Sequence, residues 1–454
     1  MRQTHIGHKL RNAIASLTIA SVGIAGAAMP AAAVADPDVM RPWYAASTSG
    51  AYQYPLTPEG NPAAWRAAAA DTASIVTRLR VPERRLRSMT TAEVLETVFS
   101  YPFLVNYWLF DTPQQGIEAL VRECAALQEF LRRGDGAQVL LELYESTDLQ
   151  DVAASEGLDA TIQVAFIELL LAQPAILNSL GRDGRGAMAD AVTERWVEKQ
   201  TVFSSDFYGE GMSALAVMRA LELDSAEFAG MAAASSDVTE FLSTGLSITL
   251  TETSWQATEP VVRSELGSVY AVDVDALMAA DMVQSVSPIV QDAGPVSIQS
   301  ISYLGTNVYT PKGSAVRALN VIGDLSQAER DAIDRSVRDA YPGVTISRAS
   351  TAKYNCHSYA FYGQSSGNGV WINDPALYMS DGSYSLVASK TYTNTIPTVA
   401  ANGSKVSYVS GGHSAIKYSS TQFISKWGQG PLVIHKPTST PYSSTTGLKY
   451  YKLA

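Results

Sequence analysis

The spacing of the apolar residues changes along this chain, and that change limits the folds it can adopt. From residue 62 to about 243 apolar residues recur at helical spacing, whereas from about 246 they alternate in short β-branched runs bounded by turn residues. After residue 344 the chain is rich in Ser, Thr, Tyr and Gly. The pattern predicts a multidomain α+β protein with an N-terminal helical bundle at 62–243, a β-rich linker segment with one helix at 244–343, and a C-terminal α+β domain at 344–454.

Capping patterns place the helices of the first region. Thr90 stands three residues before Glu93, which is the spacing of a capping box. Thr112 precedes Pro113, and this pair predicts the start of a second helix, which we expect to end at Gly134.

Other segments are assigned from their composition. DATIQVAFIELLLAQP is apolar nearly all round, which predicts the buried centre of the bundle, and GRDGRG at 181–186 predicts a loop. The expected strands lie in LSITLTETSW, VVRSELGSVYAVDV, VSIQSISYLGTNVYTP and SAVRALNVIG. One helix, DLSQAERDAIDRSVRDAYPG, is expected to interrupt them.

The first 35 residues have the composition of a secretory signal peptide. Arg2, Lys9 and Arg11 form a basic leader, and an uncharged apolar run follows from residue 13 to residue 29. Ala33-Val34-Ala35 is then a site for signal peptidase. We therefore expect a secreted protein, extracellular or associated with the cell wall; a membrane anchor is the alternative, but the apolar run is short for a span.

The charge of the chain is unevenly distributed. Its net charge is −11, yet residues 344–454 are basic, so the acidic excess lies before them. This argues against nucleic acid as a partner. The basic tail would suit an anionic cell wall, although an ordinary solvated face explains it as well. Residues 36–61 are rich in Pro, Ser and Gly and are expected to form a tether; no membrane span is expected in the mature protein, and the oligomeric state is left open.

The chain has only two cysteines. Cys124 falls on an apolar stripe of a predicted helix, which indicates a small buried residue. A disulfide between Cys124 and Cys356 is the alternative, because exported proteins often contain disulfides.

The second cysteine lies in YNCHSYAF, where Asn355 is a favoured N-cap. Cys356 would then occupy the first turn of a helix, where unpaired backbone N–H groups favour a thiolate. Downstream, SKVSYVSGGHSAIKYS predicts a strand, a turn and a second strand that opens with His413. We expect the resulting small antiparallel sheet to present His413 to the start of the cysteine helix.

This order of cysteine helix and histidine strand resembles the NlpC/P60 and CHAP branch of the papain-like cysteine peptidases and amidases. The resemblance covers about the last 110 residues. It implies a papain-like domain that cleaves an amide bond in a peptide or in peptidoglycan, without a cofactor. Cys356 would be the nucleophile and His413 its base. The third residue, which orients the base, would be Ser425, about twelve positions after the histidine, or His435 instead.

Three departures from the family pattern weaken the catalytic prediction. Asn355 stands where Asp or Gln is usual, Ser404 replaces the Asp that follows the strand-opening Gly, and Ser425 is a weak orienting residue. The insert WINDPALYMSDGSYSLV is longer than a minimal version needs, and we expect it to form one wall of a substrate cleft.

Two other functions fit the same residues. A catalytically inactive papain-like module that binds a cell-envelope ligand is the main alternative. A zinc site formed by Cys356, His413 and His435 is a further one, but no metal-ligand spacing supports it, so no metal is expected. His357 is interpreted as a structural or cleft-lining residue. A hydrogen bond between the Cys356 sulfur and the His413 ring would favour the enzyme, whereas side chains that point apart would favour the binding module.

The leader gives a prediction that can be checked on the secreted protein. Because Ala33-Val34-Ala35 fits signal peptidase, N-terminal sequencing should begin at Asp36 or within a few residues of it. A leader retained on protein in the membrane fraction would contradict this.

Overall fold

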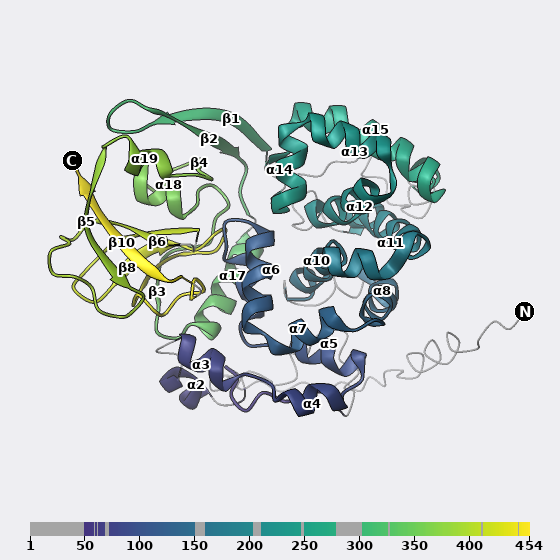
Figure 1. Ribbon diagram of the computed structural model, residues 1–454, viewed down its shortest axis with the longest axis horizontal. Helices are drawn as coiled ribbons and strands as arrows, with labels where there is room; N and C mark the ends of the chain where they lie inside the picture. Colours follow the sequence, from purple (N-terminus) through teal and green to yellow (C-terminus); the bar gives the residue numbers. More distant parts are fainter. Residues whose placement is uncertain are drawn as a thin grey trace, which may run out of the picture. The chain divides into compact units, whose positions relative to one another are not determined.

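Helices occupy the first part of the chain, and the strands follow from residue 302, so the protein is of mixed α+β class (Figure 1). The computed structural model describes residues 50–454 other than 59, 61, 69–71, 150–158, 203–209, 247–248, 278–301, 326, 410–411 and 444. The predicted leader lies outside the described residues. The helices up to residue 270 are α2 Pro62–Ala68, α3 Thr72–Arg78, α4 Glu83–Ser88, α5 Thr91–Phe99, the 3-10 helix η1 Leu104–Trp108, α6 Pro113–Glu123, α7 Ala125–Arg132, α8 Gly136–Ser146, α10 Asp159–Leu171, α11 Pro174–Val202, α12 Glu210–Asp224, α13 Ala226–Ala234, α14 Ser236–Thr244 and α15 Glu252–Tyr270.

The predicted caps are present, but one predicted helix is two. Thr90 and Glu93 form the capping box of α5, and the Thr112 side chain accepts a hydrogen bond from the Gln115 N–H at the start of α6. The helix expected to continue to Gly134 breaks at Cys124, whose backbone is extended at φ −95° and ψ 102°. The chain changes direction at this break, and each of the two helices buries its own apolar face, with Ile117 and Leu120 in α6 and Leu127 and Phe130 in α7.

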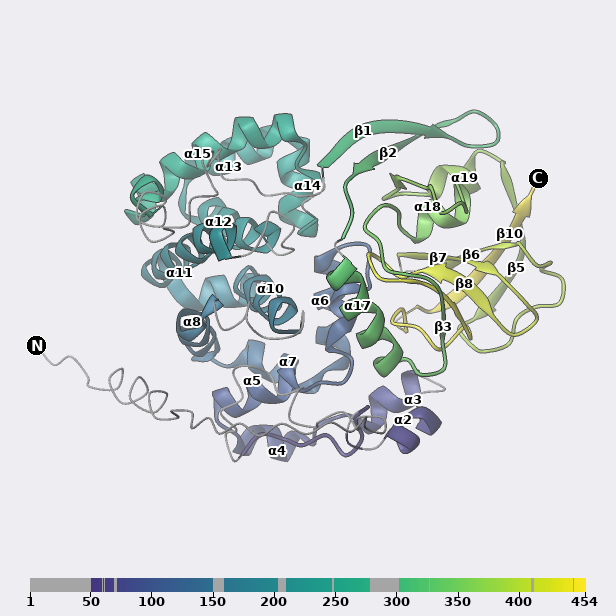
Figure 2. The same ribbon diagram turned by 180° about the vertical axis from the view of Figure 1, so that it is seen from behind.

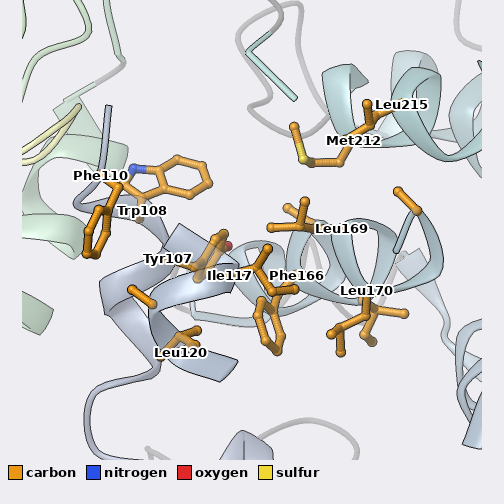
Figure 3. Close-up of a cluster of buried hydrophobic side chains, with 14 of the residues drawn as sticks. Tyr107, Trp108, Phe110, Ile117, Leu120, Phe166, Leu169, Leu170, Met212 and Leu215 are labelled. Atoms are coloured by element: carbon orange, nitrogen blue, oxygen red, sulfur yellow. The ribbon is translucent and has the colours of Figure 1, made fainter. Parts of the chain in front are cut away.

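The apolar segment of α10 is the buried centre that its composition predicts. In Figure 3, Phe166 and Leu169 of α10 gather with Ile117 of α6 and with Met212 and Leu215 of α12. All five side chains are buried. Among the described residues, only a pair of helical pieces, Gln163–Leu171 and Pro174–Lys199 bent by 72°, has the length and composition of a membrane span, and no single helix does.

The loop predicted at 181–186 is instead part of helix α11. Gly181 has φ 64° and ψ −179° and forms a kink, after which the helix resumes. Arg185 fixes the resumed turn, because its guanidinium donates to both carboxylate oxygens of Asp224 at 2.7 and 2.6 Å and to the Leu177 carbonyl at 2.9 Å. The glycine-rich composition therefore marks a kink rather than a loop.

The β-rich character predicted for residues 244–343 holds only for their second half. LSITLTETSW and VVRSELGSVYAVDV were expected to form strands, but α15 occupies most of these residues. Thr251 caps α15, and its buried face carries Trp255, Val262 and Leu266, so helical packing outweighs the β-branched composition. Two predictions are confirmed here, the hairpin of β1 Ser302–Tyr309 with β2 Ala315–Ile322 and the helix α17 Gln327–Ala340.

The strands form two antiparallel sheets. A three-stranded sheet has the order β1-β2-β4, and a seven-stranded sheet has the order β3-β9-β8-β7-β6-β10-β5. Helix α18 lies against β6, β7 and β8 of the larger sheet, as both views show (Figures 1 and 2). The remaining elements are β3 Thr345–Arg348, α18 Cys356–Phe361, β4 Val370–Trp371, α19 Ala376–Ser380, β5 Tyr384–Thr391, β6 Lys405–Val409, β7 His413–Lys417, β8 Phe423–Lys426, β9 Leu432–His435 and β10 Gly447–Leu453.

The inserted segment, residues 109–111 between η1 and α6, ties the helices to the C-terminal region. The Tyr442 hydroxyl donates to the Leu109 carbonyl at 2.5 Å, and the Phe110 ring packs edge-on against Tyr442 at 4.8 Å. Gly428, at φ +47°, lies so close that a Cβ on it would be 2.2 Å from the Phe110 carbonyl oxygen. The described residues from 50 to 454 accordingly belong to one compact unit, and the domain boundaries within it stay predictions.

The described end of the predicted tether is packed rather than free. The Tyr52 N–H donates to the Thr97 hydroxyl of α5 at 3.0 Å. Leu56 is buried, and Tyr54 packs against Tyr101. Residues 50–58 therefore belong to the helical region, while the first part of the predicted tether lies outside the described residues.

A buried ion pair joins two of the central helices, and hydroxyls from two further helices bind the same carboxylate. Glu168 of α10 accepts hydrogen bonds from Lys199 at 2.5 Å, from the Tyr144 hydroxyl at 2.6 Å and from the Ser213 hydroxyl at 3.0 Å, all at Oε1. Both members of the ion pair are fully buried. The charge of Glu168 is therefore compensated entirely from within the bundle.

We expect Lys199→Met to lower the free energy of unfolding by about 3–5 kcal/mol, because it leaves an uncompensated carboxylate in the core. Adding Glu168→Gln should recover most of the loss. Arg87→Ala, which removes the exposed partner of Glu83, should change the free energy of unfolding by less than about 1 kcal/mol. Urea unfolding of the variants measures this, and an effect of Lys199→Met as small as that of Arg87→Ala would contradict it.

Candidate functional site

The cysteine helix α18 begins as its sequence predicts. The Asn355 side chain caps it by accepting from the Ser358 N–H at 3.0 Å. The same side chain donates to the Ile372 carbonyl at 2.7 Å, which joins the helix start to the insert that follows it. Cys356 is the first residue of the helix and is fully buried. Cys124 is also buried, and both cysteines are free thiols, so the alternative of a disulfide between them is wrong.

The nearest acidic group to the Cys356 sulfur comes from the helical region. Oδ2 of Asp111, in the inserted segment, lies 3.2 Å from the Cys356 Sγ. The same oxygen lies 3.3 Å from Nε2 of His357, the next residue of α18. Oδ1 of Asp111 is buried and has no hydrogen-bond partner in the described part of the chain. One carboxyl thus contacts both a thiol and an imidazole.

Strand β7 supplies the next contact. The Ser414 hydroxyl lies 2.9 Å from Nδ1 of His357. Ile416, two residues on, packs in the cluster that contains Tyr359 of α18, whereas Ala415 belongs to the core on the other side of the sheet. Because side chains alternate along a strand, the face that Ser414 and Ile416 share is the one that meets the cysteine helix.

His413 makes no hydrogen bond to that helix in the described part of the chain. Its ring stacks on Tyr442 with centroids 3.6 Å apart and planes at 12°. Neither ring nitrogen has a hydrogen-bond partner among the described residues, so the expected bond to Cys356 is absent. The strand starts at His413, as the sequence predicts, while the neighbouring Ser414 is the residue of this strand whose side chain contacts His357.

The two candidates for orienting His413 bind each other instead. The Ser425 hydroxyl lies 2.8 Å from Nε2 of His435, and Nδ1 of His435 lies 2.8 Å from the Lys436 carbonyl. The Trp427 indole N–H also donates to Ser425 at 3.1 Å. Neither Ser425 nor His435 therefore holds His413. The alternative zinc trio of Cys356, His413 and His435 is not assembled either, since His435 is bonded elsewhere.

Burial controls the ionisation of the cluster. It raises the pKa of Asp111 to about 7, although the hydrogen bond from Cys356 and the charge of Lys426 partly oppose it. Burial, and then the charge of Asp111, raise the pKa of the Cys356 thiol well above its usual value. Burial also lowers the pKa of His357 to about 4. The thiol and the imidazole are thus both neutral at pH 7, which differs from the thiolate expected at a helix start.

A buried lysine is the nearest cation. Nζ of Lys426 donates to the Thr351 carbonyl at 2.8 Å and to the Gly428 carbonyl at 2.7 Å. Burial lowers its pKa to about 7, although the charges of Asp324, Asp111 and Cys356 oppose this shift. Lys426 therefore couples electrostatically to the thiol and its carboxyl.

A cavity of about 340 Å³ lies beside the insert WINDPALYMSDGSYSLV, which is a different part of the chain from the inserted segment at residues 109–111. Trp371, Asn373 and Asp374 line one side of it, and Glu240 and residues of β2 line the rest. Asp374 is also the charge that opposes the lowered pKa of His357. The insert thus forms a cavity wall near the cluster, as its length predicts.

Asp111, His357 and Lys426 were not predicted as site residues. Asp111 stands directly before the capping residue Thr112, a position where an acid is most simply solvated, and nothing local links it to Cys356. From the sequence, His357 is interpreted as a structural or cleft-lining residue, yet Asp111 contacts both His357 and Cys356. The signal that could have found Lys426 is its place in SKWG, next to the candidate Ser425.

Comparisons with protein-family models, with curated proteins and with solved structures found no match.

The buried histidines give a pH prediction. Burial lowers the pKa of His435 from 6.5 to about 4, so below pH 6.5 the unfolded chain binds a proton that the folded protein does not. His435 should therefore cost stability as pH falls from about 6.5 to 4, by about 1.4 kcal/mol per pH unit. His435→Gln should remove that part of the pH dependence in urea unfolding.

Phe423→Leu is the matched control, because Phe423 packs against His435 and does not titrate. It should lower the free energy of unfolding equally at each pH. An unchanged slope in His435→Gln would mean that His435 titrates normally.

Proposed function

We propose that the protein is a secreted thiol hydrolase that cleaves an amide bond in a peptide or in peptidoglycan, with Cys356 as its nucleophile. Export is supported by the leader sequence. The papain-like architecture is supported by a capped cysteine helix that packs on an antiparallel sheet. The amide substrate is supported by the resemblance to NlpC/P60 and CHAP enzymes.

The observation that carries the proposal is the contact chain around the sulfur. It runs from Cys356 to Asp111, from Asp111 to His357 and from His357 to Ser414, with separations of 3.2, 3.3 and 2.9 Å. A nucleophile, a proton acceptor and a group that orients the acceptor are the parts that thiol catalysis requires. Here a carboxyl holds the middle position in place of His413.

The chemistry follows from these contacts. The sulfur attacks the carbonyl carbon of the amide while its proton passes to the Asp111 carboxylate, which His357 holds in place. The C–N bond then breaks, and the leaving amine takes that proton. Water attacks the resulting thioester, the C–S bond breaks, and the acid product leaves as the thiol regains its proton. The positive charge of Lys426 would favour the thiolate during attack.

The cavity beside the insert is the best candidate for the substrate cleft. It combines the indole of Trp371 and the side chain of Leu377 with the polar Asn373, Asp374 and Glu240. An apolar wall with a few polar groups is typical of a small-ligand site. Because Cys356 is fully buried, the substrate reaches the sulfur only after surrounding residues move, and in this mechanism Asp111 stays beside the sulfur while they do.

A binding module without catalysis is the second candidate, and the burial of Cys356 favours it. The raised pKa of the thiol points the same way, since a neutral thiol is a poor nucleophile. In this case the cavity would bind a cell-envelope peptide, and Cys356 would be a core residue.

The test compares hydrolysis and thiol labelling in matched variants. Amine release from purified peptidoglycan and from a peptide mixture should be lost in Cys356→Ala and kept in Cys124→Ala. Asp111→Asn should lower the rate by about 100-fold or more. His413→Phe, which keeps the stack on Tyr442, should retain most of the activity.

Labelling by iodoacetamide in EDTA needs no substrate. Both cysteines are buried. The native protein should still be alkylated faster at Cys356 than at Cys124, because a hydrolase must expose Cys356 to its substrate and has no need to expose Cys124. Equal, slow labelling together with no hydrolysis would leave the binding module ahead. Hydrolysis that is lost in His413→Phe but kept in Asp111→Asn would reject the role of Asp111 and favour the base that the family resemblance implies.

A further inference from the structure

We propose that Asp111, Cys356 and His357 form a binding site for a thiophilic divalent cation, of which Zn²⁺ is the best fit. The site needs only these three side chains, so it does not rest on the proposed hydrolysis. It also differs from the trio of Cys356, His413 and His435, which the fold keeps apart.

The geometry is that of a ligand set. One ligand atom from each of the three residues lies within 4.8 Å of the other two. A tetrahedral zinc ion with bonds of about 2.0 to 2.3 Å separates its ligand atoms by about 3.4 to 3.6 Å. The observed separations from Asp111 Oδ2, 3.2 Å to Cys356 Sγ and 3.3 Å to His357 Nε2, are close to that edge.

A second observation points to a ligand. Oδ1 of Asp111 is buried and has no hydrogen-bond partner among the described residues, and Asp111 is only 5 % exposed. A buried oxygen without a partner is costly, and coordination would compensate it. The Asp111 carboxylate can bind a cation through either oxygen. A cation bound through Oδ1 would therefore give this unpaired oxygen a partner.

Charge and the surrounding contacts fit as well. A divalent cation, a thiolate, a carboxylate and a neutral imidazole sum to no net charge, which suits a site without solvent. The Ser414 hydroxyl at Nδ1 of His357 would accept the ring N–H and leave Nε2 free for the metal, as is usual for ligating histidines. Sulfur and imidazole select zinc over magnesium.

Three protein ligands leave one tetrahedral position for water or another small ligand. Binding would also clamp the inserted segment to α18, because Asp111 comes from the inserted segment and the other two ligands, Cys356 and His357, come from α18. If the protein is a hydrolase, as proposed above, a cation on the sulfur would hold it inactive until the metal is removed.

Cobalt titration of the full chain, freed of metal with EDTA and then dialysed, tests the site. Wild-type protein should take up one Co²⁺ with a near-ultraviolet sulfur-to-cobalt charge-transfer band, and Zn²⁺ should displace it. Mg²⁺ should not compete. Incubation over hours allows for slow entry, because the ligands are at most 6 % exposed.

Cys356→Ala should abolish the charge-transfer band, and Asp111→Asn and His357→Gln should each weaken Zn²⁺ binding by about 100-fold or more. Ser414→Ala should weaken it by about 10-fold. Cys124→Ala, which removes the other buried thiol, should bind as the wild type does. A variant that fails to fold is recognised by circular dichroism, and Ser414→Ala then still tests the site.

Absence of the band in wild-type protein, or its persistence in Cys356→Ala, would overturn the proposal. So would equal loss in Cys124→Ala. Hydrolysis measured in EDTA separates the two proposals: activity without metal binding rejects only the cation site, and metal binding without activity rejects only the hydrolase.

Discussion

The contact between Asp111 and Cys356 is the interaction on which the site depends. It requires the inserted segment to enter the C-terminal region, and that entry requires a glycine at position 428, where any Cβ would collide with the Phe110 carbonyl. Tyr442 then seals the segment by bonding to Leu109 and packing on Phe110. The carboxyl is thus placed by packing around it, and its raised pKa follows from the same burial.

The sequence predicted local structure best where a local signal exists. The capping box at Thr90, the Asn355 cap and the hairpin whose second strand opens with His413 were all predicted, because each depends on residues a few positions apart. Helix α15 was missed because β-branched composition is a weak guide when a buried helical face is available. The resemblance to papain-like enzymes stays a prediction, and among the described residues the ring nitrogens of His413 have no hydrogen-bond partner.

The site was only half predictable for a different reason. Cys356 could be found from its cap and its helix, but Asp111 is 245 positions away and carries no local mark. The face of His413 could not be chosen either, since both faces of β7 are buried and the usual alternation of polar and apolar residues is lost. When both faces of a strand are buried, the alternation of polar and apolar residues that would show which side chains face which side is missing from the sequence.

The separation of Asp111 and Cys356 in the chain also sets an order of events during folding. A ribosome delivers the carboxyl long before the thiol, and contacts between distant residues form late because closing a long loop is entropically costly. Until the inserted segment docks, the cysteine of a nascent chain remains open to oxidants and to other thiols. When Tyr442 packs on Phe110, the inserted segment is in place and the Cys356 sulfur becomes inaccessible to oxidants and thiols in the solvent.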